Sequence, residues 1–144
     1  MQLHIWDELG WQGVRAIIEP CVNLNYKHCF SIRLWKGKCQ DEGVRLICQY
    51  VVKQPNVTIL ELLDCNITAL GCEFLQKAFW PPMTGAGLGS NLSIIKLDHN
   101  PIGAKGMNLL AEALSKNPIV QQLSLTYCGI TAEGGSGLFR ILLY

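Results

Sequence analysis

The sequence predicts an α/β solenoid, in which repeated units of one strand and one helix stack into an inner parallel β-sheet and an outer layer of α-helices. Two observations support this prediction. Four segments of the 144-residue chain share one order of apolar and variable positions, and this order recurs at a spacing of about 28 residues. A unit of this length has room for a short strand, a turn, an amphipathic helix and a return loop.

The repeated order is an apolar residue, two variable positions, a second apolar residue, one variable position and a third apolar residue. A small or amide residue follows, then another apolar residue, and then a glycine. The second apolar positions of the four copies are Ile32, Leu60, Ile95 and Leu123. Their spacings are 28, 35 and 28 residues, so one unit carries an insertion of seven residues.

An earlier and less regular copy lies at the N-terminus. When one residue is deleted, Leu3–Trp6 aligns with Ile32–Trp35, and residues 13–17 align with residues 43–47. We therefore expect about five units that form a single domain over residues 1–144. The insertion falls within residues 81–91, where prolines and glycines predict a loop.

Each unit should contribute one short strand to a single parallel sheet, because apolar and polar residues alternate there. The expected strands are residues 3–6, 30–35, 58–63, 93–98 and 121–126.

Helices should follow the strands, because apolar residues recur there at helical spacing. The expected buried stripes are Val44, Ile47, Cys48 and Val51; Leu70, Phe74, Leu75 and Ala78; and Met107, Leu110, Ala111 and Leu114. Thr68 and Thr131 are expected to cap helices. Pro20 should end the first helix at Glu19, and glycines at 134, 135 and 137 should weaken the last one.

A small or amide side chain stands at the turn after four of the strands. These turn residues are Gly37, Cys65, Asn100 and Cys128. An amide both donates and accepts hydrogen bonds, a thiol does so weakly, and glycine has no side chain to offer. We therefore expect the turns at Gly37 and Cys65 to be looser than the turn at Asn100.

The repeat order and its spacing resemble the leucine-rich repeats of the ribonuclease-inhibitor type, over the chain from about Leu3 to its end. The resemblance implies that the turn asparagine, here Asn100, bonds to backbone groups that the turn leaves unpaired. It also implies a domain without enzymatic activity that binds another protein on its concave face. Members of this group include nuclease inhibitors, sensor domains of nucleotide-binding innate receptors, activators of the Ran GTPase, and cytoskeletal or ciliary scaffold subunits.

Composition argues against several classes of function. The formal net charge is +1 and 16% of the residues are charged, so we expect no nucleic-acid partner. No apolar run is long enough to cross a membrane, and the N-terminus lacks the regions of a signal peptide. Seven cysteines, mostly at expected core, turn or helix positions, favour a reducing compartment such as the cytoplasm. Glycosylation sequons at Asn56, Asn66 and Asn91 point the other way.

The residue patterns give no reason to expect a metal, a cofactor or a catalytic centre. The three histidines lack the spacing of paired ligands, and the glycine-rich residues 85–89 follow a helix, unlike a phosphate-binding loop. Asp98 and His99 are expected to be a solvated polar pair. Because residues 139–144 are apolar and carry no cap, we expect a piece of a longer repeat protein, or a subunit whose ends dock on neighbours.

The candidate binding site is the concave face of the sheet, formed by strand positions that face away from the helices. Aromatic and charged residues mix there, as they do in protein interfaces. Trp6 and Trp35 are the strongest candidate anchors, although they could instead merely stack on each other. The residues expected to contact a partner are Trp6, Arg33, Trp35, Glu61, Leu63, Lys96, Asp98, His99 and Tyr127.

We therefore expect a protein-interaction module or a scaffold subunit of an intracellular assembly, with the cytoskeleton or the cilium as one setting. Two alternatives stay open. The domain could regulate an enzyme, as a GTPase activator or a nuclease inhibitor does, with Arg33 as a candidate surface arginine. It could also be a fragment of an extracellular or innate-immune receptor, which the sequons permit.

Overall fold

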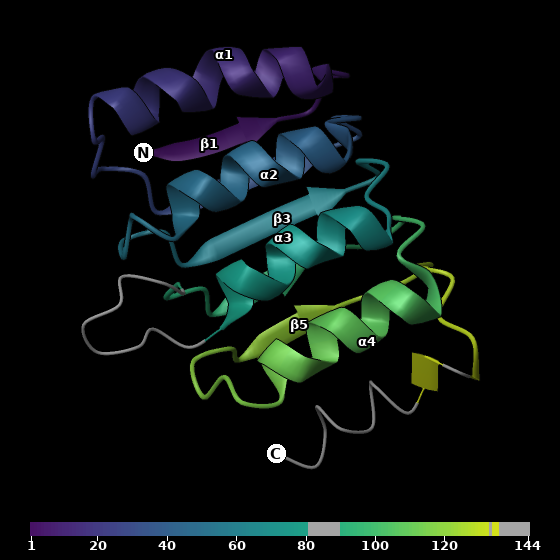
Figure 1. Cartoon of the computed structure of the whole chain (residues 1–144). Coiled ribbons are helices and arrows are strands. Elements are labelled where there is room, and N and C mark those ends of the chain that lie inside the picture. Colours follow the sequence, from purple (N-terminus) through teal and green to yellow (C-terminus); the bar gives the residue numbers. More distant parts are fainter. Residues whose placement is uncertain (81–89, 133, 136–144) are drawn as a thin grey trace.

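The computed structural model describes residues 1–80, 90–132 and 134–135, and it shows the expected α/β solenoid (Figure 1). Strands and helices alternate along the chain, and the helices lie together on one side of the sheet. The elements are β1 (Gln2–Ile5), α1 (Gly10–Asn23), β2 (Ser31–Trp35), α2 (Gln40–Val51), β3 (Ile59–Leu63), α3 (Ala69–Phe79), β4 (Ile94–Lys96), α4 (Gly103–Leu114) and β5 (Gln122–Ser124).

The strands form one parallel sheet in the order β1-β2-β3-β4-β5. Their register follows the sequence repeat, because five equivalent apolar residues pair in succession across the sheet. These residues are Leu3, Ile32, Leu60, Ile95 and Leu123. The irregular first copy is therefore confirmed as a full member of the repeat.

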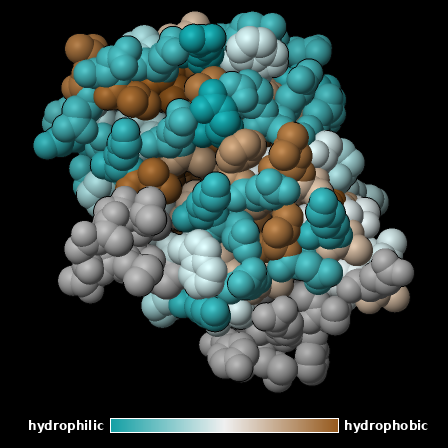
Figure 2. Space-filling model, in the orientation of Figure 1, coloured by the Kyte–Doolittle hydropathy of each residue, from teal (hydrophilic) through white to brown (hydrophobic). Residues whose placement is uncertain are grey.

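The hydrophobic core lies between the sheet and the helix layer. Ile32, Leu60 and Ile95 are fully buried on neighbouring strands, and Ile47 and Leu110 are fully buried on the helices. Each such side chain stabilises the fold by roughly 1.5–3 kcal/mol relative to its exposed state. Figure 2 shows the helix side of the molecule, where hydrophilic residues cover most of the surface and smaller hydrophobic patches interrupt them.

The first helix corrects the expectation that Pro20 ends it, because α1 continues through Pro20 to Asn23. Proline removes one helical hydrogen bond, the one to the carbonyl of Ala16 four residues earlier. Ala16 and Pro20 both lie on the exposed side of α1, where water can bind the freed carbonyl. The helix resumes directly, since the Leu24 N–H donates to the Pro20 carbonyl at 2.9 Å.

The start of α3 confirms one prediction and corrects another. Thr68 caps the helix, because its hydroxyl accepts a hydrogen bond from the Leu70 N–H at 3.2 Å. Asp41 of α2 in turn accepts hydrogen bonds from the Thr68 N–H and hydroxyl at 2.8 and 2.7 Å. Leu70 was expected in the buried stripe, but it is 54% exposed, whereas Leu75 of the same helix is fully buried. The second residue of the helix thus lies at its surface.

Some predictions fall outside the described residues. They concern most of the insertion at 81–91, the glycine-weakened helix after Thr131, and the apolar segment 139–144. Within the insertion, Ser90 is described, and its hydroxyl donates to the Ala78 carbonyl at 2.6 Å. Among the described helices, none combines the length and the apolar character that a membrane crossing requires.

Candidate functional site: the concave sheet face

The predicted rows of the concave face lie side by side in the sheet. One row, which we call the charged row, consists of His4, Arg33, Glu61, Lys96 and Ser124, each paired with the next across neighbouring strands. In the next row, Trp35 pairs with Leu63. Most of these side chains are partly exposed, but Glu61 is only 4% exposed. The register therefore brings the predicted residues together, with one difference in exposure.

Glu61 lies beneath its neighbours. Its Oε1 atom is 3.2 Å from Lys96 Nζ and 3.5 Å from Arg33 Nε. Its Oε2 atom accepts a hydrogen bond from Trp35 Nε1 at 3.1 Å. Glu61 is therefore less exposed than expected of a residue that contacts a partner, because the three side chains around it cover its carboxylate.

The two tryptophans contact each other at the C-terminal ends of β1 and β2, the first two strands of the sheet. The ring centroids of Trp6 and Trp35 are 4.2 Å apart, with the planes at 69°, an edge-to-face arrangement. His4 joins them, with its ring centroid 4.4 Å from that of Trp6. Trp6 nevertheless remains 57% exposed and Trp35 partly exposed. The rings therefore contact each other edge to face, and the pair still presents an aromatic surface to solvent.

A hollow of about 710 Å³ opens at the C-terminal ends of the strands. Its lining consists of Trp35, Lys36, Leu63, Asp64, His99, Asn100, Pro101, Tyr127 and Gly129. The rings of His99 and Tyr127 stack on one side of it, with centroids 5.0 Å apart and planes at 21°. Trp35 belongs both to the aromatic pair and to this hollow, so the two features form one continuous surface.

Four residues of the hollow share an uncommon backbone conformation. Lys36, Asp64, His99 and Tyr127 have φ angles between 51° and 59°. Positive φ is uncommon for residues other than glycine, and such strained conformations cost of order 1–3 kcal/mol each. The strand and turn pattern predicted the place of these residues. The left-handed backbone had a weak signal at Asp64 and His99, whose residue types are enriched at positive φ, and none at Lys36 and Tyr127.

Asp98 and Asp64, two of the aspartates at this edge, accept hydrogen bonds from neighbouring residues. Asp98 Oδ1 accepts hydrogen bonds from the Ser124 hydroxyl and the Thr126 N–H, each at 2.7 Å. Asp64 Oδ1 accepts one from Lys38 Nζ at 2.7 Å, and this bond raises the pKa of Lys38. Sequence reasoning missed Lys38, because the residue stands outside the strand pattern and its partner belongs to the next unit.

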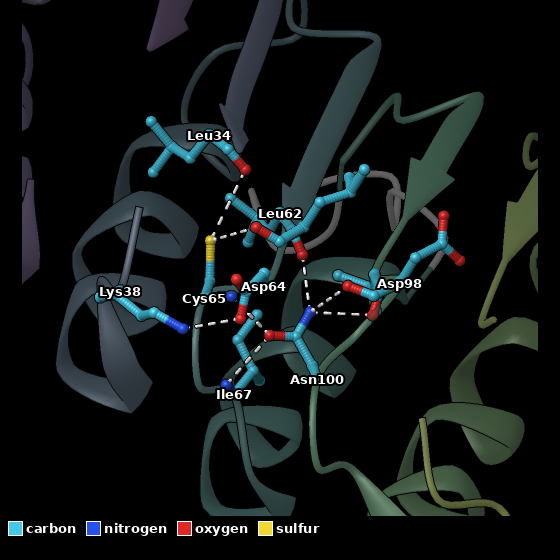
Figure 3. A network of polar contacts seen from close by, with 10 residues as sticks. Leu34, Lys38, Leu62, Asp64, Cys65, Ile67, Asp98 and Asn100 are labelled. Carbon is cyan, nitrogen blue, oxygen red and sulfur yellow. Dashed lines mark hydrogen bonds and ion pairs between the residues drawn. The ribbon is translucent and has the colours of Figure 1, made fainter. Parts of the chain in front are cut away.

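The turn residues link neighbouring units, and Asn100 does so most fully (Figure 3). Its side chain is buried, with 1% of the residue exposed. The amide nitrogen donates to the carbonyl oxygens of Leu62 at 2.7 Å and Leu97 at 2.8 Å. The amide oxygen accepts from the N–H groups of Cys65 at 2.9 Å and Ile67 at 3.2 Å. The buried backbone groups of the turn are thereby satisfied.

At two other turns a cysteine occupies the position equivalent to Asn100. Cys65 Sγ lies 3.6 Å from the Leu34 carbonyl oxygen, and Cys128 Sγ lies 3.1 Å from that of Leu97. In each case the acceptor is the third apolar residue of the repeat order in the preceding unit, as Leu62 is for Asn100. Gly37 has no side chain, but its carbonyl accepts hydrogen bonds from the N–H groups of Leu9 and Gly10 at 3.1 and 2.9 Å.

The thiols have the character of buried hydrophobic groups. All seven cysteines are free, and six of them are buried. Burial raises the pKa of Cys48 to about 12 and that of Cys72 to about 12, so both stay protonated and unreactive at neutral pH. Within the described ranges, no group of three or more histidine, cysteine or acidic side chains could hold a metal ion.

The sheet register, the single helix layer and the asparagine turn define the class of this molecule. The chain is a leucine-rich repeat protein of the ribonuclease-inhibitor-like type. The family described as Leucine Rich repeat matches residues 116–139. Domains of this class are protein-binding modules.

The relatives extend the similarity over most of the chain. The NACHT, LRR and PYD domains-containing protein 14 of Mus musculus is 33% identical over 83% of this chain and 12% of its own length. The NACHT, LRR and PYD domains-containing protein 5 of Homo sapiens is 32% identical over 88% of this chain and 12% of its own length. The ribonuclease inhibitor of Sus scrofa is 27% identical over 98% of this chain and 30% of its own length. The chain therefore spans well under half the length of each of these relatives.

Proposed function

We propose that this domain is a non-enzymatic interaction module that binds a protein partner through the concave face of its sheet. The observation that carries the proposal is the pair of Trp6 and Trp35, which stays partly exposed although the two rings contact each other. Tryptophan is enriched among the residues that dominate binding energy at protein interfaces. Here the pair lies beside a hollow large enough to take side chains of a partner.

The strained backbone at the rim of the hollow also supports this proposal. Lys36, Asp64, His99 and Tyr127 occupy equivalent places in successive units, and Tyr127 is 79% exposed. Residues in costly backbone conformations often cluster at binding sites. Their side chains differ in charge and shape, as expected for a surface that recognises one particular partner.

The cellular setting of this binding is part of the proposal. Free, buried thiols support a reducing compartment inside the cell. The relatives do not add support for the cytoskeletal or ciliary setting, because they are NACHT, LRR and PYD domains-containing proteins and a ribonuclease inhibitor. Of the alternatives that the sequence left open, these relatives favour the innate-receptor repeat and the nuclease inhibitor.

The test is affinity capture from the source cells, read by mass spectrometry, with the intact domain and with a Trp6→Ala, Trp35→Ala double variant. Leu70→Ala is the matched control, because Leu70 is 54% exposed on α3, in the helix layer, while Trp6 is 57% exposed on the sheet side. We expect a set of proteins that the control retains and the double variant loses. Circular dichroism and urea unfolding establish that each variant is folded.

If the double variant is folded and captures the same proteins as the intact domain, the concave face is not the binding surface. A loss that the Leu70→Ala control shares would also contradict the proposal, because it would place recognition on the helix side or in overall stability.

Nuclease inhibition is the second candidate function, because the similarity to the pig ribonuclease inhibitor covers 98% of this chain. We expect the domain, added in excess, to slow RNA hydrolysis by a pancreatic-type ribonuclease if it inhibits as that relative's name states. An unchanged rate removes this candidate. Regulation of a GTPase has less support, because Arg33 already lies 3.5 Å from Glu61 in an ion pair.

A further inference from the structure

The charged row exposes its cations and hides its anion. The side chains of Arg33 and Lys96 are 26% and 32% exposed, whereas the side chain of Glu61 between them is 5% exposed. A single carboxylate oxygen, Glu61 Oε1, lies near both cations. The cluster therefore has a formal charge of +1, and a partner that approaches the sheet meets the cations first.

Both cations keep donors that Glu61 does not use. A guanidinium has five N–H donors and an ammonium has three. Arg33 approaches Glu61 only through Nε, at a distance without hydrogen-bond geometry, and within the described part of the chain this nitrogen has no hydrogen-bond partner. The buried Nε2 atom of His4, next to Arg33 in the same row, is likewise unpartnered there. Beyond the buried Nε, the guanidinium of Arg33 and the ammonium of Lys96 thus keep N–H donors that Glu61 leaves unused.

Two of the acidic groups at this end of the sheet, Asp98 and Asp64, have other partners. Asp98 accepts two hydrogen bonds from β5 and its flank, where Ser124 and Thr126 lie. Asp64 is paired with Lys38 at 2.7 Å. Lys36, which is exposed, adds another positive charge to the lining of the hollow. An approaching carboxylate therefore meets Arg33 and Lys96, two cations that share one buried carboxylate.

An apolar site lies one row further along the same strands. Trp35 and Leu63 follow Arg33 and Glu61 by two residues and line the hollow together with Pro101 and Tyr127. Residues two apart on a strand lie roughly 6.5–7 Å apart on the same face. An extended peptide has the same spacing between alternate side chains, so one segment can reach both the charged row and the hollow.

We propose that the concave face binds an extended, acidic segment of a partner protein, in which a carboxylate side chain reaches Arg33 and Lys96 and a large apolar side chain two positions away enters the hollow. This inference rests on the proposed function and adds the chemistry of the partner. A carboxylate there forms charge-assisted hydrogen bonds with both cations. A basic segment meets like charges at the same place, which gives the surface its selectivity.

The first experiment selects binders from a displayed library of random linear peptides on the immobilised domain, with counter-selection on the Trp35→Ala variant. We expect enrichment of Asp or Glu two positions from Trp, Phe or Leu. An enriched peptide is then synthesised with Glu, Gln or Lys at the acidic position, and binding is measured by fluorescence anisotropy. The Gln peptide should bind about tenfold more weakly than the Glu peptide, and the Lys peptide more weakly still.

Substitutions at Lys96 and Glu61 should change the affinity for the Glu peptide in opposite directions. Lys96→Met should weaken binding of the Glu peptide by about fivefold, and Lys96→Arg should restore it. Glu61→Gln should strengthen it by about threefold, because the amide oxygen still accepts from Trp35 Nε1 while the competing charge is gone. A purely structural role for Glu61 predicts a loss instead. If Glu61→Gln does not fold, the Lys96 pair and the three peptides still decide the question.

Enrichment of basic or uncharged peptides, a selection that yields no peptide, or a Gln peptide that binds as tightly as the Glu peptide would each overturn the inference. The proposed function fails separately, when affinity capture finds no protein whose binding depends on Trp6 and Trp35. A tryptophan-dependent partner whose binding is insensitive to Lys96→Met leaves the concave face as the site and removes the acidic segment.

Discussion

The turns at Asn100 and at Cys65 perform the same task with different chemistry. Asn100 bonds to two backbone N–H groups and three carbonyl oxygens, and it reaches back to Leu62 of the preceding unit. Cys65 reaches the equivalent carbonyl, that of Leu34, through a sulfur at 3.6 Å. Both side chains are almost completely buried. The repeat therefore accepts an amide or a thiol at this position, and no side chain at all at Gly37, so the strength of the link differs from unit to unit.

The largest expected effect comes from the strand beside these turns. Leu97 is fully buried, and its carbonyl accepts hydrogen bonds from both Asn100 and Cys128. Leu97→Ala keeps the carbonyl and removes only the core side chain, so it should lower the free energy of unfolding by roughly 2–5 kcal/mol. Urea unfolding measures this loss. A value below about 1 kcal/mol would contradict the inward position of the side chain.

Truncating the turn side chains to alanine should show how much the amide and the thiol each stabilise the fold. Asn100→Ala leaves buried N–H and carbonyl groups without hydrogen-bond partners and should lower the free energy of unfolding by about 3 kcal/mol. Cys65→Ala removes a weaker donor and should cost about 1 kcal/mol. Both values come from urea unfolding at pH 7, with Leu70→Ala as a surface control. Equal costs for Asn100→Ala and Cys65→Ala would show that the amide adds nothing beyond the thiol.

Alkaline pH should affect buried thiols and leave the amide unchanged. Burial raises the pKa of Cys128, and raises those of Cys48 and Cys72 to about 12, from an ordinary value of 9.0. The unfolded chain loses these protons first, so stability is fully present below pH 9 and falls as pH rises toward 12. Each thiol should contribute up to roughly 1.4 kcal/mol per pH unit.

The measurement is urea unfolding at pH 8, 9 and 10 for the intact domain and for Cys72→Ala. The variant should show a shallower decline of the unfolding free energy, because one buried titrating group is gone. Identical slopes would mean that Cys72 ionises as readily in the folded state as in the unfolded chain.

Much of the architecture could be predicted because it depends on local order. The repeat spacing determined the strand register, as the succession of Ile32, Leu60 and Ile95 across the sheet shows. The buried role of Asn100 followed from the resemblance to a known repeat. These features depend on which residue types occupy which place in a unit, and the sequence displays that directly.

The wrong predictions concern residues whose exposure depends on side chains of neighbouring units or on their place along a helix. The exposure of Glu61 could not be predicted, because alternation places it on the open face while three side chains from two other strands cover it. Pro20 remained inside α1 because the carbonyl that it frees faces solvent. Leu70 has the right spacing for burial but lies at the very start of its helix. Each of these outcomes depends on lateral packing or solvent access rather than on residue order.

The left-handed residues at the strand ends have a consequence for how this surface can evolve. Lys36, Asp64, His99 and Tyr127 adopt nearly the same backbone bend although their side chains have little in common. The bend is therefore compatible with a cationic, an acidic and two aromatic side chains of different shape. Substitution among side chains of these kinds can then change which partner the surface prefers while the backbone keeps its path.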